Sequence, residues 1–423
     1  MPSGNFRDRN FPRTAGHILL DLIQMTDERY PEFHPVAPLP TGTDLVAALD
    51  FRRLPKILLH EHLDGGLRPA SIIELAKQQG YGGLPTSDAD DLAKWFHRGA
   101  QRGNLPEYLE GFSHTIAVMQ TRDALCRVAF EFIEDMAKDG VVYAEVRFAP
   151  VFHTAQGLTQ DEVVEAVIAG LEEGGKRFGV EWGLIICAMR DRTDSLQAAE
   201  LAIRWRDHGV VGFDLAGGEY GHPPKKHIEA FQAIQRANFH ITIHAGEAFG
   251  PDSIWQALQW CGAHRLGHGT RLRYDIDLQP DGTLKLGRLA QYILDRRVPL
   301  EMCLSSNVHT GACASFEEHP FALFHRAGFR VFLNTDDRLM SDTKMSKELE
   351  IAATTFGLSL VELEKMTMNA MKSAFIPHQR RVELIRHRLL PTYSMLFAEL
   401  TAKAFASQLP SNPYLPCTSP NAS

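Results

Sequence analysis

The sequence predicts an α/β fold, a (β/α)8 TIM barrel with additional helices. Eight apolar segments of strand length recur along the chain, each bounded by Gly, Pro or Asp, and stretches with helical periodicity separate them. Near-continuous apolar strands are typical of a parallel sheet covered on both faces, and eight strand–helix units indicate that the sheet closes into a barrel. A dinucleotide-binding fold is the weaker alternative, because no Gly-x-Gly-x-x-Gly sequence follows the first strand.

The predicted strands alternate with helices from about residue 57 onward. The strands are expected at 57–60, 141–149, 182–189, 210–217, 240–246, 265–269, 298–304 and 329–335. Two helices begin with a capping box, in which a Ser or Thr pairs with a Glu three residues later. Thr159 and Glu162 open a helix that should reach about Arg177, and Ser359 and Glu362 open another. We expect a single barrel domain over residues 51–405.

Both ends of the chain differ from the barrel region in composition. Residues 1–50 are expected to form a partly helical extension, with a short helix over 15–25 followed by the proline-rich sequence PEFHPVAPLPTG, which disfavours a long helix. Residues 406–423 are rich in Ser, Pro and Asn and have little apolar surface to bury, so we expect a disordered tail.

Composition and charge restrict the kinds of molecule that the protein is expected to bind. Hydrophobic residues make up 44% of the chain and charged residues 23%, as in soluble domains with a large core. The net charge of -8 leaves no basic face for phosphates, so we expect no nucleic-acid partner and favour a small or neutral ligand. No apolar run near the N-terminus is long enough for a signal peptide or a membrane span, so we expect a cytoplasmic protein with no membrane partner.

The six cysteines show no C-x-x-C pairing. Cys187 and Cys303 lie in apolar runs that are typical of buried strands, so we expect free thiols in a reducing compartment. A thiolate zinc site of the zinc-finger kind is therefore not expected.

The sequence KILLHEHLDGG (56–66) is typical of a strand that delivers metal ligands. Alternate side chains of a strand share a face, so His60 and His62 can converge on one ion while Glu61 points away. Other predicted strands also end in polar residues, in one case beside a glycine, and all such ends share one rim of a barrel. These residues are Asp214, Gly217, His244, Glu247, His268, Asp336 and Asp337. Each alone could be a core histidine, a helix N-cap or a loop residue, but their joint placement favours a site.

The ligand types at this rim suit a catalytic zinc ion, which needs three protein ligands and an open position for water, and sometimes expands to five ligands. Such a set is present in His60, His62, His244 and Asp336. The ion would lower the pKa of bound water from 15.7 to roughly 7, while Glu247 and His268 remain free for proton transfer. A helical His-Glu-x-x-His site is excluded because Asp64 stands four residues after His60, and a cytidine-type deaminase motif lacks its Pro-Cys-x-x-Cys pair.

Five stretches of the chain resemble the signature motifs of the adenosine deaminases, in the same order. They are KILLHEHLDGGLRP, DLAGGE (214–219), ITIHAGE (241–247), RLGHGT (265–270) and FLNTDD (332–337). Two further stretches, VVYAEVRFAP and NAMKSAFIP, are similar to the bacterial members. The resemblance covers roughly residues 51–377, and the agreement of five separate motifs makes it specific.

The resemblance implies a zinc-dependent hydrolytic deamination of adenosine and 2′-deoxyadenosine to inosine and 2′-deoxyinosine plus ammonia, in purine salvage. It implies a small-molecule purine nucleoside as partner and one Zn²⁺ ion held by the four residues named above. By the same resemblance Glu247 would protonate purine N1 and His268 would orient the attacking hydroxide. The implied substrate contacts are Asp337 to N7, the Gly217 backbone N–H to N3, Asp64 to a ribose hydroxyl, and His62.

The segment 105–112 has an apolar face at helical spacing, formed by Leu105, Tyr108, Leu109 and Phe112. Such a face is more often plain core, but its position matches the hydrophobic gate of the family, so a lid over the purine site is the sharper interpretation. On the second strand, Glu145 and Arg147 share one face and are interpreted as a structural ion pair.

The chain departs from the family pattern at Glu61, Gly218 and Arg338, and none of these positions is a ligand or the acid. The sugar side of the substrate is the part least fixed by motifs. A deaminase of adenine or of another 6-aminopurine derivative is therefore the nearest competing function, although Leu63 and Asp64 favour a nucleoside.

A nucleotide substrate and a non-catalytic role have less support. A nucleotide would need a basic phosphate cradle, and Arg68 is the single nearby candidate. A non-catalytic barrel that only binds ligands predicts the loss of a metal ligand or of Glu247, and all of these residues are present.

Overall fold

The computed structural model describes residues 46, 49–103 and 105–408. The predicted helix over 15–25, the proline-rich sequence, most of the predicted tail and Cys417 lie outside the described residues. The other five cysteines are free thiols, and Cys187 and Cys303 are buried as predicted. None of the described helices combines the length and the apolar character that crossing a membrane requires.

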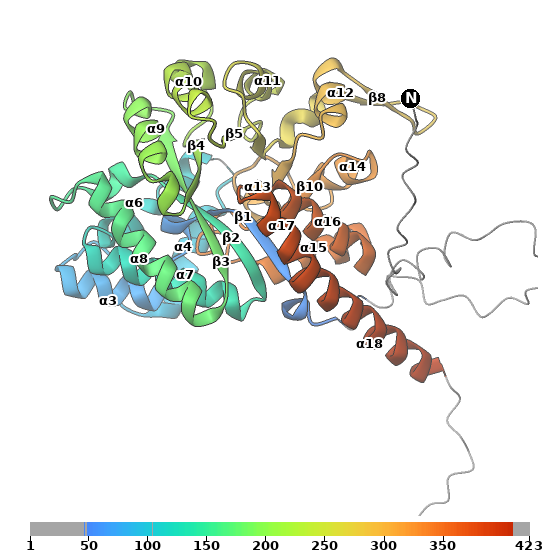
Figure 1. Cartoon of the computed structure of the whole chain (residues 1–423), viewed down its shortest axis with the longest axis horizontal. Coiled ribbons are helices and arrows are strands. Elements are labelled where there is room, and N and C mark those ends of the chain that lie inside the picture. Colours follow the sequence, from blue (N-terminus) through green and yellow to red (C-terminus); the bar gives the residue numbers. More distant parts are fainter. Residues whose placement is uncertain (1–45, 47–48, 104, 409–423) are drawn as a thin grey trace, which may run out of the picture.

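Eight parallel strands form the centre of the fold (Figure 1). They are β1 (Lys56–His62), β2 (Val141–Phe148), β3 (Glu181–Met189), β4 (Val210–Ala216), β5 (Thr242–Ala245), β6 (Arg265–His268), β9 (Leu300–Met302) and β10 (Val331–Leu333). They form two four-stranded sheets, in the orders β1-β2-β3-β4 and β10-β9-β6-β5. The predicted barrel is confirmed, and each predicted strand coincides with one of these eight.

Single backbone bridges close the barrel at the two seams between the sheets. At one seam Glu61 on β1 bridges to Asp336, just after β10, and an equivalent bridge joins β4 to the start of β5. The His62 amide donates to the Asp336 carbonyl at 2.7 Å, and the Asp336 amide donates to the His60 carbonyl at 3.0 Å. Closure of the first seam therefore places three predicted metal ligands side by side.

Helices cover the outside of the barrel. After β1 come α3 (Pro69–Gln79), α4 (Ala89–Ala100), α5 (Leu105–Leu109), α6 (Phe112–Val118) and α7 (Arg122–Lys138). The middle of the chain contains α8 (Gln160–Phe178), α9 (Ser195–Arg204), α10 (Ile228–Arg236), α11 (Pro251–Gln259), α12 (Arg288–Asp295), α13 (Leu304–His309) and α14 (Phe321–Arg326). The chain continues with α15 (Met345–Phe356), α16 (Leu360–Ser373), α17 (His378–Leu384) and α18 (Leu390–Gln408). Both predicted capping boxes are present, at the starts of α8 and α16.

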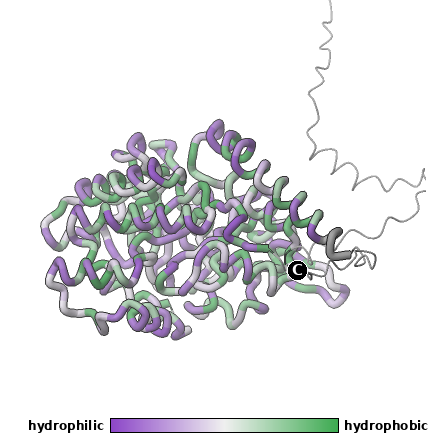
Figure 2. Tube along the Cα trace, turned by 90° about the horizontal axis from the view of Figure 1, so that it is seen from below, coloured by the Kyte–Doolittle hydropathy of each residue, from purple (hydrophilic) through white to green (hydrophobic). Residues whose placement is uncertain are grey.

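The outer helices bury one face each, and purple and green segments alternate along them in Figure 2. Glycines allow α7 and α8 to approach closely. A Cβ atom on Gly170 would lie 2.1 Å from the Cys126 carbonyl oxygen, and one on Gly174 would lie 2.8 Å from Ile133 Cβ. Because real Cβ atoms do not approach so closely, a larger residue at either position would push the two helices apart.

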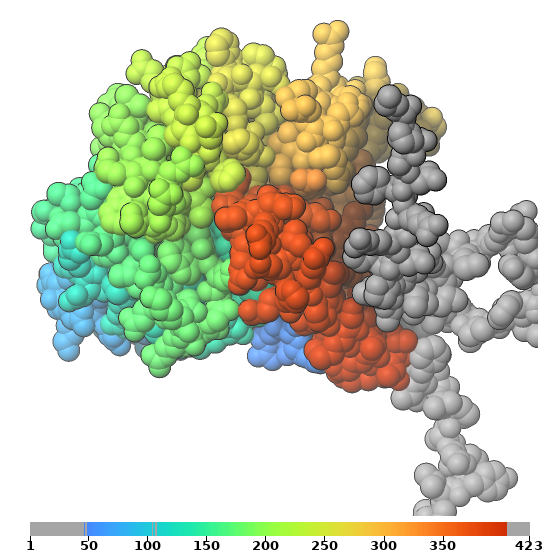
Figure 3. Space-filling view, viewed as in Figure 1, coloured from blue at the N-terminus to red at the C-terminus, as the bar shows by residue number. Residues whose placement is uncertain are grey.

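The C-terminal helices cover the seam between β1 and β10. Helix α16 contacts both strands. In Figure 3 the red C-terminal helices lie directly against the blue start of the described chain. Arg53 and Glu399 form an ion pair at 2.6 Å across this contact.

Charged residues fill the barrel interior beneath the strand ends. Arg147 pairs with Asp214 at 3.2 Å and with Glu301 at 3.0 Å, while Glu145 pairs with Arg265 at 2.6 Å. All five side chains are buried. Glu145 and Arg147 are therefore structural, as predicted, but they pair with these other residues rather than with each other.

Candidate active site

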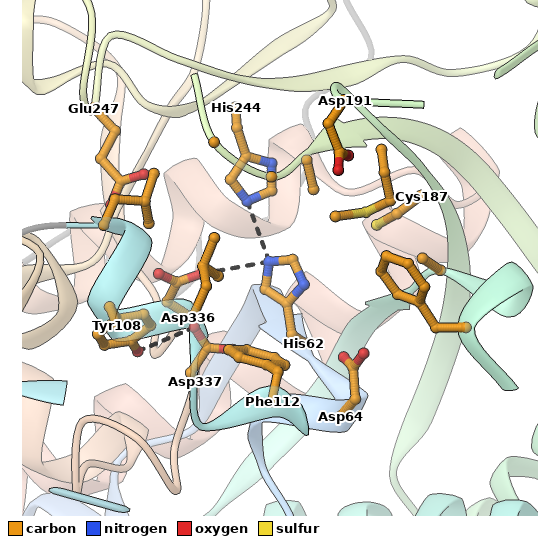
Figure 4. Close-up of a pocket in the computed structure, with 18 of the residues that line it drawn as sticks. His62, Asp64, Tyr108, Phe112, Cys187, Asp191, His244, Glu247, Asp336 and Asp337 are labelled. Atoms are coloured by element: carbon orange, nitrogen blue, oxygen red, sulfur yellow. Dashed lines mark hydrogen bonds and ion pairs between the residues drawn. The ribbon is translucent and has the colours of Figure 1, made fainter. Parts of the chain in front are cut away.

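A cavity of about 460 Å³ opens at the carboxyl ends of the strands (Figure 4). Its volume lies within the usual range for small-molecule sites. Among its lining residues are His62, Asp64, Gly217, His244, Glu247, His268, Asp336 and Asp337. His60 is fully buried beside them, with its ring centre 4.6 Å from that of His244. The structure therefore brings all the sequence-predicted site residues together.

Buried carboxylates orient two of the histidines. Glu301 Oε2 lies 2.7 Å from His60 Nδ1, and Asp214 Oδ2 lies 3.0 Å from His244 Nδ1. Interactions with His244 and Arg147 hold the pKa of Asp214 well below its usual range in spite of burial, and Arg147 and Arg265 do the same for the pKa of Glu301, so both groups are acceptors. Each histidine must therefore carry its proton on Nδ1, which leaves the Nε2 lone pair facing the centre of the site.

Histidine ring nitrogens and a carboxylate oxygen meet at this centre. His60 Nε2 is buried with no hydrogen-bond partner, 3.0 Å from Asp336 Oδ1. His62 Nε2 lies 3.1 Å from His244 Nε2 and 3.5 Å from Asp336 Oδ1. Burial lowers the pKa of His62 to about 3 and that of His244 to about 4, so both rings are neutral near pH 7. Imidazole nitrogens and one carboxylate in this arrangement are the donor set that suits a divalent metal ion.

His268 is a competing member of this group. The ligand atoms of His60, His244, His268 and Asp336 lie within 4.8 Å of one another, as do those of His62, Asp336 and Asp337. The second oxygen of Asp336 accepts from Ser306 Oγ at 2.6 Å, which leaves Oδ1 for the centre. Distance alone therefore does not decide whether His62 or His268 completes the set.

Glu247, the predicted acid, follows β5 and is buried. Thr310 Oγ1 donates to its Oε1 at 2.9 Å, and Oε2 lies 3.7 Å from His268 Nε2. Burial raises the pKa of the Glu247 carboxyl above its usual value. A raised pKa suits a carboxyl group that must deliver a proton near neutral pH.

Glu219 is a positioning residue that sequence reasoning missed. Its buried carboxylate accepts four consecutive backbone N–H groups, from residues 246–249, at 2.7 to 3.0 Å. These bonds hold the loop that carries Glu247. The acid at the end of the DLAGGE motif, directly after a strand, is the signal that could have found it.

Asp337 is held by the segment that was predicted as a possible lid. Tyr108 Oη donates to Asp337 Oδ2 at 3.0 Å and lies 3.0 Å from Ser341 Oγ. Asp337 Oδ1 is buried without a partner. Gly65 leaves the room for this carboxyl group, because a Cβ atom there would lie 1.8 Å from Oδ1. One oxygen of Asp337 is thus fixed by Tyr108, and the other remains for a ligand.

The apolar face at 105–112 lines the cavity instead of the core alone. Leu105, Tyr108, Leu109 and Phe112 all contribute to the lining. The face is not one helix, because the chain is interrupted between α5 and α6 at Gly111. Its position over the cavity favours the lid interpretation.

Glu61 and Arg338, two of the departures from the family pattern, form an ion pair. Arg338 Nε donates to Glu61 Oε1 at 2.7 Å, behind β1, so Glu61 points away from the centre as predicted. Arg338 Nη1 also pairs with Asp135, which in turn pairs with Arg68. Arg68 is therefore engaged outside the cavity and does not line it.

A parallel barrel with a histidine and carboxylate centre at the carboxyl ends of its strands defines a hydrolase of the metal-dependent barrel class. Residues 55–388 match the family model described as adenosine deaminase. The chain belongs to this family, and it is an enzyme of the hydrolases that act on C–N bonds.

Known proteins resemble the chain over most of its length. Adenosine deaminase 1 of Streptomyces coelicolor is 55% identical over 361 residues, which cover 84% of this chain and 91% of the relative. The crystal structure of adenine deaminase from Arthrobacter aurescens has a TM-score of 0.72 at 25% identity and covers 82% of this chain and 99% of the other. The arabidopsis N6-mAMP deaminase has a TM-score of 0.68 at 28% identity, over 79% of this chain and 97% of the other.

Proposed function

We propose that this chain catalyses the hydrolytic deamination of adenosine and 2′-deoxyadenosine to inosine and 2′-deoxyinosine plus ammonia, as a cytoplasmic enzyme of purine salvage. The observation that carries the proposal is a buried acid, Glu247, beside a cluster of histidine nitrogens in a cavity of about 460 Å³. Membership of the adenosine deaminase family and 55% identity to a curated member support the same reaction.

One Zn²⁺ ion would be held by His60, His62, His244 and Asp336. The fit rests on the buried, unpartnered His60 Nε2 and on the carboxylates that turn the imidazole lone pairs inward. When bound, the ion would lower the pKa of a coordinated water from 15.7 to roughly 7.

The chain's own residues supply the proton transfers. Protonated Glu247 donates to purine N1, which makes C6 electrophilic, since an aromatic C6 resists attack until N1 carries a proton. His268, with Nε2 3.7 Å from Glu247, orients the attacking oxygen. The hydroxyl proton on the tetrahedral C6 then passes to the amino group, which leaves as ammonia, and the purine becomes the 6-oxo product. The proton released by the attacking water restores Glu247. General acid–base groups of this kind typically contribute about 10²- to 10⁴-fold each.

Other lining residues place the substrate. Burial and the neighbouring Asp336 raise the pKa of Asp337 well above its usual value, so its protonated Oδ1 is assigned as the donor to N7. The Gly217 backbone N–H is assigned to N3. Asp64 lines the same cavity and is assigned to a ribose hydroxyl, with its Oδ1 buried and unpartnered. His62 contacts the substrate in addition to the metal. The apolar face over 105–112 keeps water from the purine.

The charge of the cavity favours a nucleoside over a nucleotide. Five of its described lining residues are Asp or Glu, and none of them is Lys or Arg. A phosphate group would therefore meet like charge, and no Lys or Arg side chain of the described lining would offset it. Free adenine would leave the predicted sugar contact at Asp64 unused. Deamination of adenine is the second candidate, since a solved relative is an adenine deaminase.

A side-by-side substrate panel tests the proposal. Purified protein should convert adenosine and 2′-deoxyadenosine, with loss of the adenine absorbance and release of ammonia, much faster than adenine or AMP. Reaction with adenine but not with adenosine would overturn the nucleoside assignment. A protein that converts none of the four would refute the proposed reaction.

A further inference from the structure

The role of His268 depends on which of its ring nitrogens carries the proton. A neutral imidazole has one N–H group and one lone pair. With the proton on Nδ1, the Nε2 lone pair would face the centre as a ligand. With the proton on Nε2, the same atom would be a donor directed at Glu247 and Asp336, which lie 3.7 and 4.0 Å away.

A buried hydrogen-bond chain with a fixed direction reaches the other nitrogen of His268. It begins at the first residue of α14, where the Phe321 backbone N–H donates to His319 Nδ1 at 3.1 Å. His319 Nε2 lies 3.1 Å from Asn307 Oδ1 on α13, and Asn307 Nδ2 lies 2.9 Å from His268 Nδ1. All four residues are buried.

The backbone amide sets the direction of the whole chain, because it can only donate. His319 Nδ1 must therefore accept, and since burial lowers the pKa of His319 to about 3, its single proton sits on Nε2. That proton goes to the carbonyl oxygen of Asn307. The reversed amide is excluded, because it would place two N–H groups against each other. The Asn307 NH₂ group is thereby directed at His268 Nδ1, which must accept.

We propose that Asn307 and His319 are positioning residues that fix His268 with its proton on Nε2. His268 then has no lone pair for the metal, so His62 completes the ligand set and His268 donates its N–H to the oxygen that attacks C6. This inference rests on the proposed function and deepens it, because it assigns different roles to two histidines that distance alone leaves equivalent.

The decisive variant is Asn307→Asp, which keeps the shape of the side chain and reverses its polarity. A carboxylate can only accept, so His268 would have to carry its proton on Nδ1 and turn a lone pair toward the centre. Asn369→Asp is the matched control, because it places the same charge at a buried Asn that donates to the Val331 carbonyl and does not line the cavity. His319→Leu is a second variant, which frees Asn307 to adopt both amide orientations.

The primary readout is the tautomer of His268 in the full-length Zn²⁺-loaded protein. Two-bond ¹H–¹⁵N spectra of histidine-labelled protein distinguish the two N–H positions, and the His268 signals are those lost in His268→Asn. We expect the proton on Nε2 in the unmodified chain and in Asn369→Asp, on Nδ1 in Asn307→Asp, and a mixture in His319→Leu.

Steady-state kinetics supply the second readout. Removal of one donor to a developing oxyanion typically lowers kcat about 10²- to 10³-fold, so Asn307→Asp should lose kcat by this factor with little change in KM. His319→Leu should lose less. Asn369→Asp should keep the kcat of the unmodified chain.

Two results would overturn the proposal. One is a His268 proton on Nδ1 in the unmodified protein, and the other is an unchanged tautomer in both Asn307→Asp and His319→Leu. If Asn307→Asp does not fold, His319→Leu decides alone. Failure of the proposed function is a separate result, because an inactive unmodified chain would leave the tautomer spectra readable.

Discussion

Replacement of Glu219 by Gln should show how strongly the position of Glu247 affects the rate, because Glu247 keeps its own carboxyl group in this variant. Glu219 does not line the cavity, yet its two oxygens accept the backbone N–H groups of residues 246–249. In Gln the carbonyl oxygen can replace only one of them. If it takes the place of Oε2, three bonds remain, and the Gly246 N–H faces the new NH₂ group.

The expected loss in the free energy of unfolding follows from the number of hydrogen bonds that Glu219 accepts. A hydrogen bond to a charged group contributes roughly 1.5 to 3 kcal/mol and a neutral one roughly 0.5 to 1.5 kcal/mol. Three bonds weakened by roughly 1 to 1.5 kcal/mol each and one lost bond of roughly 1.5 to 3 kcal/mol therefore give an upper limit of about 7.5 kcal/mol in the free energy of unfolding. Ala248 is only partly buried and Phe249 is exposed, so water can replace about half of these bonds, and we expect a loss of about 2 to 4 kcal/mol.

The catalytic effect should exceed what stability alone predicts. The freed loop carries Glu247, and a displacement of about 1 Å at a reacting group can reduce the rate about 10²-fold. We expect kcat for adenosine to fall 10- to 100-fold with the metal content unchanged, because Asp214 still orients His244. Urea unfolding, the initial rate of absorbance loss and metal analysis measure the three quantities.

The matched control is Glu362→Gln, which removes a carboxylate that accepts the Ser359 backbone N–H at the start of α16. It should lower the free energy of unfolding but leave kcat intact. A Glu219→Gln variant that unfolds more easily yet keeps full kcat would show that the loop bonds do not set the position of the acid. An unchanged free energy of unfolding would show that the four hydrogen bonds accepted by Glu219 do not stabilise the fold.

Three further substitutions test the assigned roles. Glu247→Gln keeps the acceptor for Thr310 but has no proton to deliver, so kcat should fall about 10²- to 10⁴-fold with the metal retained; near-normal turnover would remove its role. Asp336→Ala should leave less than one metal ion per chain after dialysis, and full stoichiometry would contradict ligation. Tyr108→Phe should reduce kcat/KM for adenosine several-fold but affect 7-deazaadenosine less, because Tyr108 acts through Asp337 and N7; equal losses would exclude that route.

The fold could be predicted because the features that define a parallel barrel are local. The central strands lie in largely apolar segments, and this property can be recognised without knowledge of the neighbouring strands. The hairpin of β7 (Ile276–Leu278) and β8 (Leu284–Leu286) was missed because its residues are largely exposed, Leu278 at 72%, and give no buried pattern. The break between α5 and α6 at Gly111 was missed because both helices face the same cavity. The apolar spacing therefore continues across the break.

The ligands and the acid could be predicted from the rule that barrel chemistry lies at the strand ends. The residues that orient them could not, because their partners are distant in sequence. Asn307 contacts residues 268 and 319, and Glu301 contacts His60, 241 positions away. Glu301 did offer a signal, since a carboxylate within the apolar segment VPLEMCL must find a partner when it is buried.

The pairing of Glu61 with Arg338 also changes how the departures from the family pattern are interpreted. Removal of only one partner of a buried ion pair strongly destabilises the fold, so we interpret the two departures together. The space is built for the pair, because a Cβ atom on Gly66 would lie 2.3 Å from Glu61 Oε1. Neither of these two side chains lines the cavity, whereas Gly218 does. Of the three departures, Gly218 alone can therefore contact a substrate, and the other two brace the seam where Asp336 meets β1.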